Sequence, residues 1–148
     1  MATADFSTTG EDLTISADVA PELAEQYRQL AADRGYHFST FEWLAAKDPD
    51  FDQARLAMLR MTYTRQDGAL PTKYRELIAS AVLAFKGYPS LKLHLGRALQ
   101  EGATVAEVVQ AMEMASIPGG MATLHFAVDQ LISLEQEHPE WFADGSAT

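Results

Sequence analysis

Helix-length stretches separated by glycine and proline occupy most of this chain, and they constrain its fold more than any other feature. Apolar residues recur at helical spacing in these stretches, and no segment shows the sustained apolar–polar alternation that is typical of a strand. The sequence therefore predicts an all-α protein of about six to seven helices. The predicted helical segments are residues 18–35, 39–47, 48–64, 71–87, 89–102, 104–117 and 121–138.

The two ends of the chain differ in pattern from its middle. Residues 1–18 are small and polar without a sustained period, which predicts a flexible N-terminal arm. Residues 19–148 then fit a single helical domain of ordinary size. Within it, Thr104 and Glu107 have the spacing of a capping box, which predicts a helix start at this point. From Leu77 to Phe85 only Ser80 is polar, so we expect this helix to be buried nearly all round.

Composition excludes several classes of function. The chain has no cysteine, which rules out disulfides, thiolate metal sites and thiol catalysis. Its 21 acidic and 11 basic residues give a net charge of −10, which disfavours nucleic acid and anionic membranes as partners. The N-terminus lacks the basic and apolar segments of a signal peptide, and no apolar run is long enough to span a membrane. We therefore expect a cytoplasmic protein.

One segment of this acidic chain is basic. Residues 71–100 contain five basic residues and a single acid, Glu76. A local positive region attracts a small carboxylate because near charges outweigh distant, screened ones. The same charges also fit a solvated face that pairs with acidic helices, and both interpretations stay open. The basic residues are Lys73, Arg75, Lys86, Lys92 and Arg97.

His94 and Glu76 are the strongest candidates for catalysis in this segment. Ser90, His94 and Arg97 share one face of a helix, so His94 is expected at the boundary between core and polar surface. Glu76 enters a largely apolar helix, with Ser80 one turn later on its face. Taken singly, His94 fits a packing residue and Glu76 fits a salt bridge or a first-turn acid. Together they form a plausible acid–base pair.

The other histidines are weaker candidates. His125 precedes Asp129 by four residues, so the carboxylate is placed to orient the imidazole in a site or to form a surface pair. His37 and His138 are expected in a loop and at the surface. No two histidines have the H-x-x-x-H spacing of a helical metal site, and we expect neither a metal nor a cofactor.

Three pieces of sequence resemble the carboxymuconolactone decarboxylase family, which includes the AhpD-like alkylhydroperoxidases. They are "DPDFDQARLAML", "DGALPTKYRELIASAVLA" and "LKLHLGRALQEGATVAEVVQAMEMAS", and the similarity covers roughly Phe41 to Leu134. The resemblance implies an AhpD-like helical bundle that forms a homotrimer or hexamer, with sites near subunit contacts. It also implies a split in function, because the peroxidase branch uses a C-x-x-C pair where this chain has "YPSL". Thiol peroxidase activity is therefore excluded.

Two departures from the decarboxylase pattern concern the substrate. The family usually has Arg-Gly after the histidine, whereas this chain has Gly96-Arg97, which moves the cation about 100° around the helix. A tyrosine-containing stretch of the family is represented by "IPGGMA", which has no tyrosine. Neither change affects the scaffold.

The resulting hypothesis is a cofactor-independent, lyase-type enzyme that acts on a small carboxylated lactone or a related organic acid. In it, His94 is the acid–base group, Glu76 orients it, and the substrate contacts are Arg97, Lys92, Ser80 and His125. The same groups also suit an isomerase, hydrolase or dehydratase. A second hypothesis is a helical oligomer that binds a small ligand or a partner protein without catalysis, and a haem or metal protein is a third.

Overall fold

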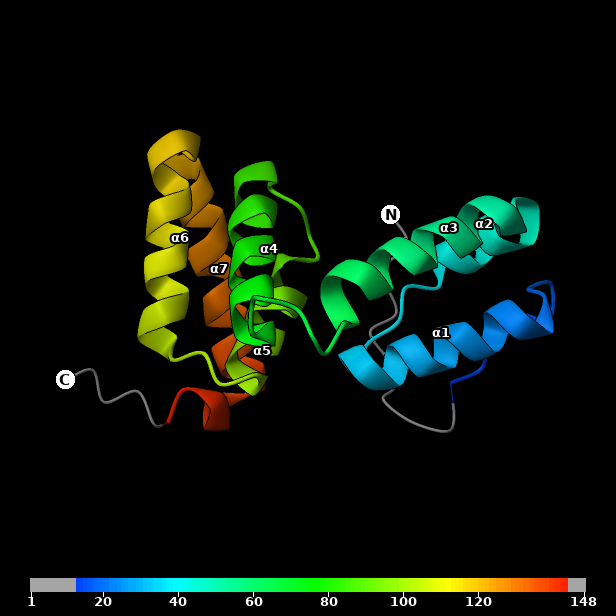
Figure 1. The fold of residues 1–148 in the computed structure, drawn as a ribbon. Coiled ribbons are helices and arrows are strands. Elements are labelled where there is room, and N and C mark those ends of the chain that lie inside the picture. The colour runs from blue at the N-terminus through cyan, green and yellow to red at the C-terminus, as the bar shows by residue number, and fades with distance from the viewer. Residues whose placement is uncertain (1–12, 144–148) are drawn as a thin grey trace. The chain divides into compact units, whose positions relative to one another are not determined.

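The computed structural model describes residues 13–143, and the chain divides into two compact units, Met1–Gly68 and Ala69–Thr148 (Figure 1). The described residues contain seven α-helices and no strand, which confirms the all-α prediction. The segment expected as one domain from residue 19 thus spans both units, and each unit is described by itself. Within residues 13–143, none of the helices has both the length and the apolar character needed to cross a bilayer.

The first unit is built from three α-helices and a π-helical turn. Asp48 and Pro49 start the third helix as their order suggests, because the Asp48 side chain accepts a hydrogen bond from the Phe51 N–H at 3.1 Å. The first helix starts at Pro21 without a side-chain cap, and it ends at Gly35, whose φ of 76° is left-handed. The elements are α1 (Pro21–Arg34), α2 (Thr40–Lys47), α3 (Pro49–Leu59) and η1 (Arg60–Thr64).

The core of the first unit includes part of the predicted arm. Ile15 is buried against the apolar side of α1, and the Ser16 N–H donates to the Glu42 carboxylate at 2.8 Å. Residues 13–18 are therefore packed onto this unit, because Ile15 and Val19 supply apolar side chains to its core. Residues 1–12 of the predicted arm lie outside the described part of the chain.

The second unit is a bundle of four α-helices. In Figure 1, α4 and α6 lie side by side with α7 behind them. Thr104 and Glu107 form both hydrogen bonds of the predicted capping box, at 3.1 and 2.8 Å. The elements are α4 (Thr72–Lys86), α5 (Leu91–Gln100), α6 (Val105–Gly119), α7 (Met121–Glu137) and the short η2 (Pro139–Trp141).

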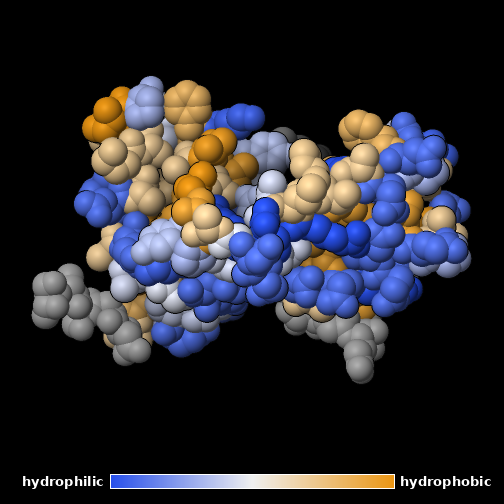
Figure 2. All heavy atoms as spheres, viewed as in Figure 1, coloured by the Kyte–Doolittle hydropathy of each residue, from blue (hydrophilic) through white to orange (hydrophobic). Residues whose placement is uncertain are grey.

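The prediction that α4 is buried all round is wrong for the isolated chain. One side of α4 is buried through Glu76, Ser80 and Ala84. The opposite side leaves Ile78 and Phe85 each 55% exposed, and apolar side chains gather over α4 in Figure 2. An apolar sequence indicates burial, but it does not show which sides of a helix the chain's own helices cover.

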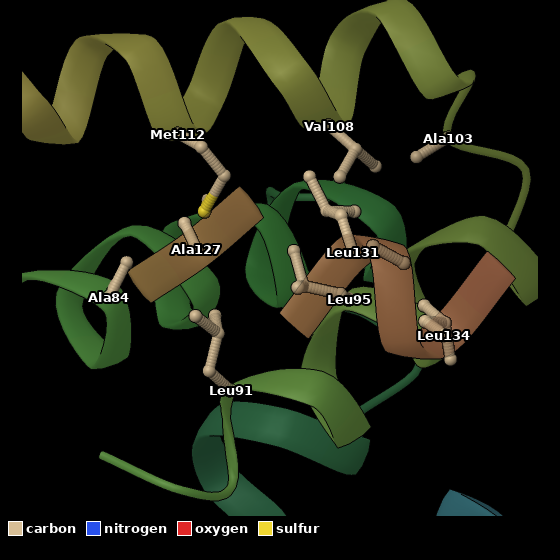
Figure 3. Packing of buried hydrophobic residues seen from close by; sticks show 10 residues of the cluster. Ala84, Leu91, Leu95, Ala103, Val108, Met112, Ala127, Leu131 and Leu134 are labelled. Carbon is tan, nitrogen blue, oxygen red and sulfur yellow. The ribbon is translucent and has the colours of Figure 1, made fainter. Parts of the chain in front are cut away.

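The core of the second unit consists of leucine, alanine, valine and methionine side chains from all four helices (Figure 3). Leu91 and Leu95 of α5 are completely buried and point toward Met112, Val108 and the α7 side chains. These contacts hold one face of α5 inside the bundle. They thereby fix the orientation of α5 and, with it, the direction in which the His94 side chain points.

Candidate functional site

Glu76 of α4 and His94 of α5 form a buried hydrogen-bonded pair. The Glu76 Oε2 and the His94 Nδ1 are 2.6 Å apart, and the two residues are only 1% and 6% exposed. Burying a carboxylate is costly unless it has a partner, so this short contact stabilises Glu76 in the core. The structure thus brings together the two residues that sequence analysis selected as the catalytic pair.

Local features of the sequence bring the pair together. Gly87 ends α4 with a left-handed φ of 60°, which lets the chain turn back into α5. Leu91 and Leu95 anchor α5 on either side of His94 in the helix register. On the other side of α5, a Cβ at Gly96 would lie 3.0 Å from the Trp141 ring, so the absence of a side chain lets η2 pack closely.

Ser80 lies one helical turn after Glu76 and is completely buried. Its Oγ has no hydrogen-bond partner among the described residues. An unsatisfied buried hydroxyl costs about 1–3 kcal/mol, so such a group in a native core calls for an explanation. The sequence indicated that Ser80 shares a face with Glu76, but it did not indicate that the hydroxyl lacks a partner.

The two cations predicted to contact substrate have carboxylate partners within the second unit. The Lys92 Nζ donates to Glu137 of α7 at 2.8 Å, and the Arg97 guanidinium is 2.9 Å from Glu101. Lys73 likewise pairs with Glu107 at 2.9 Å. The hydrogen bond from Lys92 lowers the pKa of Glu137 more than burial raises it, so this pKa lies below its usual value. For these lysines the structure favours the interpretation of a basic face paired with acidic helices.

His125 does not join the buried pair. Its side chain is 83% exposed on α7, and its Nε2 is 4.0 Å from Asp129. The spacing of four residues correctly predicted that imidazole and carboxylate share a face of the helix. The structure places that face in solvent, away from the environment of Glu76 and His94.

A second buried histidine–glutamate pair lies in the first unit. His37 lies in the loop between α1 and α2, as expected, but it is buried there: the residue is 7% exposed and its Nε2 is 2.7 Å from the Glu42 Oε1. The Tyr27 ring packs edge-on against the imidazole at 5.1 Å. No pattern around His37 marked it for burial, since its environment comes from α1 and from the start of α2.

Neither pair has the composition of a metal site. Among residues 13–143, no three histidine, aspartate or glutamate side chains converge as metal ligands. Glu76 and His94 instead combine one carboxylate with one imidazole, which is an arrangement for moving or holding a proton.

A model of the carboxymuconolactone decarboxylase family matches residues 49–131, more than half of the chain. The chain belongs to the carboxymuconolactone decarboxylase family. A crystal structure of a protein from Burkholderia xenovorans LB400, provisionally named a carboxymuconolactone decarboxylase, has a similar fold with a TM-score of 0.68. The two chains are 22% identical over 80% of this chain and 94% of that chain, which shows the shared fold only. Comparison with curated proteins gave no significant match.

The range that matches the carboxymuconolactone decarboxylase family contains the candidate pair, since Glu76 and His94 both lie between residues 49 and 131. The complete absence of cysteine separates this member from family chemistry that depends on thiols. The unusual Gly96-Arg97 order also has a local structural cause here, because Gly96 is the position against which Trp141 packs.

Proposed function

We propose that this member of the carboxymuconolactone decarboxylase family is a cofactor-independent lyase. Its substrate is a small carboxylated lactone or a related organic acid, and Glu76 and His94 perform the acid–base chemistry. The observation that carries this proposal is the 2.6 Å contact between two buried ionisable side chains from different helices. A carboxylate that holds an imidazole by a hydrogen bond is suited to general acid–base catalysis.

In this proposal the imidazole supplies the proton that replaces the carboxyl group. The bond between the ring carbon and the substrate carboxylate breaks, CO₂ leaves, and the electron pair delocalises toward the lactone carbonyl. A proton then reaches carbon from His94. Because Glu76 engages Nδ1, the exchange takes place at the other ring nitrogen, Nε2. Glu76 orients the ring through this hydrogen bond.

Ser80 is the proposed donor to the substrate. Its buried hydroxyl, one turn from Glu76, is suited to donate a hydrogen bond to the oxygen on which negative charge develops. This role gives a reason for keeping an unsatisfied hydroxyl in the core. Arg97 and Lys92 remain proposed contacts for the substrate carboxylate. To bind it, Arg97 must first release Glu101, and Lys92 must first release Glu137.

The test is turnover of carboxymuconolactone, followed as release of CO₂, in the wild type and in His94→Asn. The asparagine amide approximates Nδ1 and keeps a donor for Glu76, but it has nothing in place of Nε2. We expect kcat/KM to fall by about 10²–10⁴-fold, the usual contribution of a general acid or base. A wild type without turnover, or an unchanged His94→Asn variant, would contradict the proposal.

A matched control is available in the first unit. His37 contacts Glu42 through Nε2, so His37→Gln keeps a donor at the corresponding place. We expect this variant to have the kcat/KM of the wild type. Equal losses in both variants would show that the assay reports folding and not proton transfer.

The alternative function is ligand binding without catalysis. It is favoured by the carboxylate partners of Lys92 and Arg97, which leave both cations in structural ion pairs. On this alternative, the Glu76–His94 pair only joins α4 to α5. His94→Asn would then keep full affinity for the ligand, and the wild type would bind carboxymuconolactone without consuming it.

A further inference from the structure

The outer side of α4 carries a stripe of large apolar side chains that nothing in the described structure covers. Tyr74, Ile78, Val82 and Phe85 are 41%, 55%, 50% and 55% exposed. Their spacings of four, four and three residues place them on one face, opposite the buried side that carries Glu76 and Ser80. We call these four residues the α4 stripe.

The stripe is large enough to matter for association. Four side chains that are each about half exposed present on the order of 400 Å² of apolar surface, the scale at which patches mark interaction sites. At its end, Phe85 lies next to Gly119 of α6, with 2.9 Å between the ring and a Cβ built there. Ile117 and Met114 of the same helix are 80% and 65% exposed, and they extend the surface toward the roughly 800 Å² per partner of a stable interface.

The types of side chain along the stripe are the same when read in either direction. An aromatic residue stands at each end and a β-branched residue at each inner position. If two α4 helices lie antiparallel across a two-fold axis near residue 80, Tyr74 of one copy faces Phe85 of the other, and Ile78 faces Val82. A two-fold interface requires this self-complementarity, since each contact is made twice with the partners exchanged. A foreign partner imposes no such symmetry.

The α4 stripe differs in charge from most of the acidic surface of the chain. Each chain has a net charge of −10, so copies repel one another over most of their surface. The α4 stripe contains no charged residue, and the neighbouring Lys73 is neutralised by Glu107. The stripe itself is therefore uncharged, but the exposed Lys86 and the partly buried Arg75 border it, and an antiparallel pairing brings Lys86 of one copy near Arg75 of the other.

We propose that α4 of one copy packs antiparallel against α4 of a second copy through the α4 stripe. This contact completes the burial that the apolar sequence of α4 indicates. It gives an assembly with an even number of chains, which agrees with the expected hexamer but not with an isolated trimer. It also supports, from behind, the helix that carries Glu76 and Ser80.

Disulfide crosslinking tests the register directly, because the chain has no cysteine of its own. Full-length Ile78→Cys and Val82→Cys chains are mixed, allowed to exchange subunits and mildly oxidised. We expect more linked dimer from the mixture than from either variant by itself, since only the mixed pair is directly opposed. The pair Tyr74→Cys and Phe85→Cys should behave in the same way.

The control uses exposed apolar residues on another helix. Val128 and Ile132 of α7 are 39% and 49% exposed, and their cysteine variants should not crosslink when mixed.

In sedimentation equilibrium, Ile78→Asp should halve the mass of the assembly, and Ile132→Asp should leave it unchanged. A monomeric wild type, no preference for the mixed pair, or dissociation only by Ile132→Asp would overturn the proposal. None of these readouts depends on turnover, so the proposed activity can fail independently.

Discussion

The two units contain the same chemical pair in different surroundings. His37–Glu42 in the first unit and His94–Glu76 in the second have contacts of 2.7 and 2.6 Å, and both histidines are buried. In the first unit the second oxygen of Glu42 accepts the Ser16 N–H, so both carboxylate oxygens have protein partners. Beside Glu76, by contrast, the completely buried Ser80 hydroxyl has no partner among the described residues.

This difference teaches how a structural ion pair can be told from a candidate site. Distance and burial do not separate the two pairs. The number of unsatisfied hydrogen-bonding groups does separate them. In a closed network every polar group has a partner, whereas a buried group without a partner destabilises the fold until a bound ligand supplies one. This contrast supports the proposed role of His94–Glu76, whereas the closed network of His37–Glu42 belongs to the architecture of the first unit.

The first unit has a second closed network, and its disruption should produce the largest loss of stability. Asp52 is completely buried, accepts from Tyr27 at 2.7 Å and pairs with Arg55 at 2.7 Å. Burial and the hydrogen bond to Asp52 raise the pKa of Tyr27 far above its usual value. Asp52→Ala should lower the free energy of unfolding by about 3–5 kcal/mol, because it leaves a partly buried cation unpaired.

Urea denaturation of the full-length protein measures this loss. The exposed Asp50 of the same helix supplies the control, and Asp50→Ala should cost far less. A small effect of Asp52→Ala would show that this network is not structural, and it would weaken the contrast between the units.

The Ser80 hydroxyl gives the next effect, with the opposite sign for stability. Ser80→Ala should raise the free energy of unfolding by about 1–2 kcal/mol, since it removes an unsatisfied group and introduces a better helix former. The same change should lower kcat/KM for carboxymuconolactone, which a purely structural serine would not do.

Thr123 is the matched case for this measurement, because its buried hydroxyl already donates to the Gly119 carbonyl at 3.0 Å. Thr123→Val should therefore destabilise the protein by about 1 kcal/mol. If Ser80→Ala also destabilises, its hydroxyl has a structural partner, and the distinction between the two histidine pairs fails.

The smallest effect concerns a carboxylate at the surface of the second unit. The hydrogen bonds from Lys73 and from the Thr104 N–H lower the pKa of Glu107. The unfolded chain thus binds this proton at a higher pH than the folded one. The stabilisation is present above the unfolded value, near pH 4.3, and is lost as the pH falls through the lower folded value.

This sign can be checked with Glu107→Gln. The difference in unfolding free energy between the wild type and the variant should be constant near pH 7 and shrink below about pH 4.5. Glu113→Gln, on the same helix, serves as the control for changing an acid to an amide. A difference that grows on acidification would contradict the assignment.

Sequence patterns determined the helices and most of their ends. The Thr104–Glu107 capping box, the Asp48–Pro49 start and the stops at Gly35 and Gly87 depend on neighbours within a few residues, so local spacing was sufficient. The absence of cysteine likewise excluded thiol chemistry without any structure. Glu76 and His94 were selected correctly as partners because consecutive helices joined by a short turn pack against each other.

Tertiary structure decided what each side chain contacts. It buried His37, exposed His125 and gave Lys92 and Arg97 carboxylate partners. It also left the Ser80 hydroxyl without a hydrogen-bond partner in the described part of the chain. It also showed that only one side of α4 is covered by residues 13–143. The physical reason is that burial and hydrogen bonding depend on residues distant in sequence, whose arrangement a helical period does not contain.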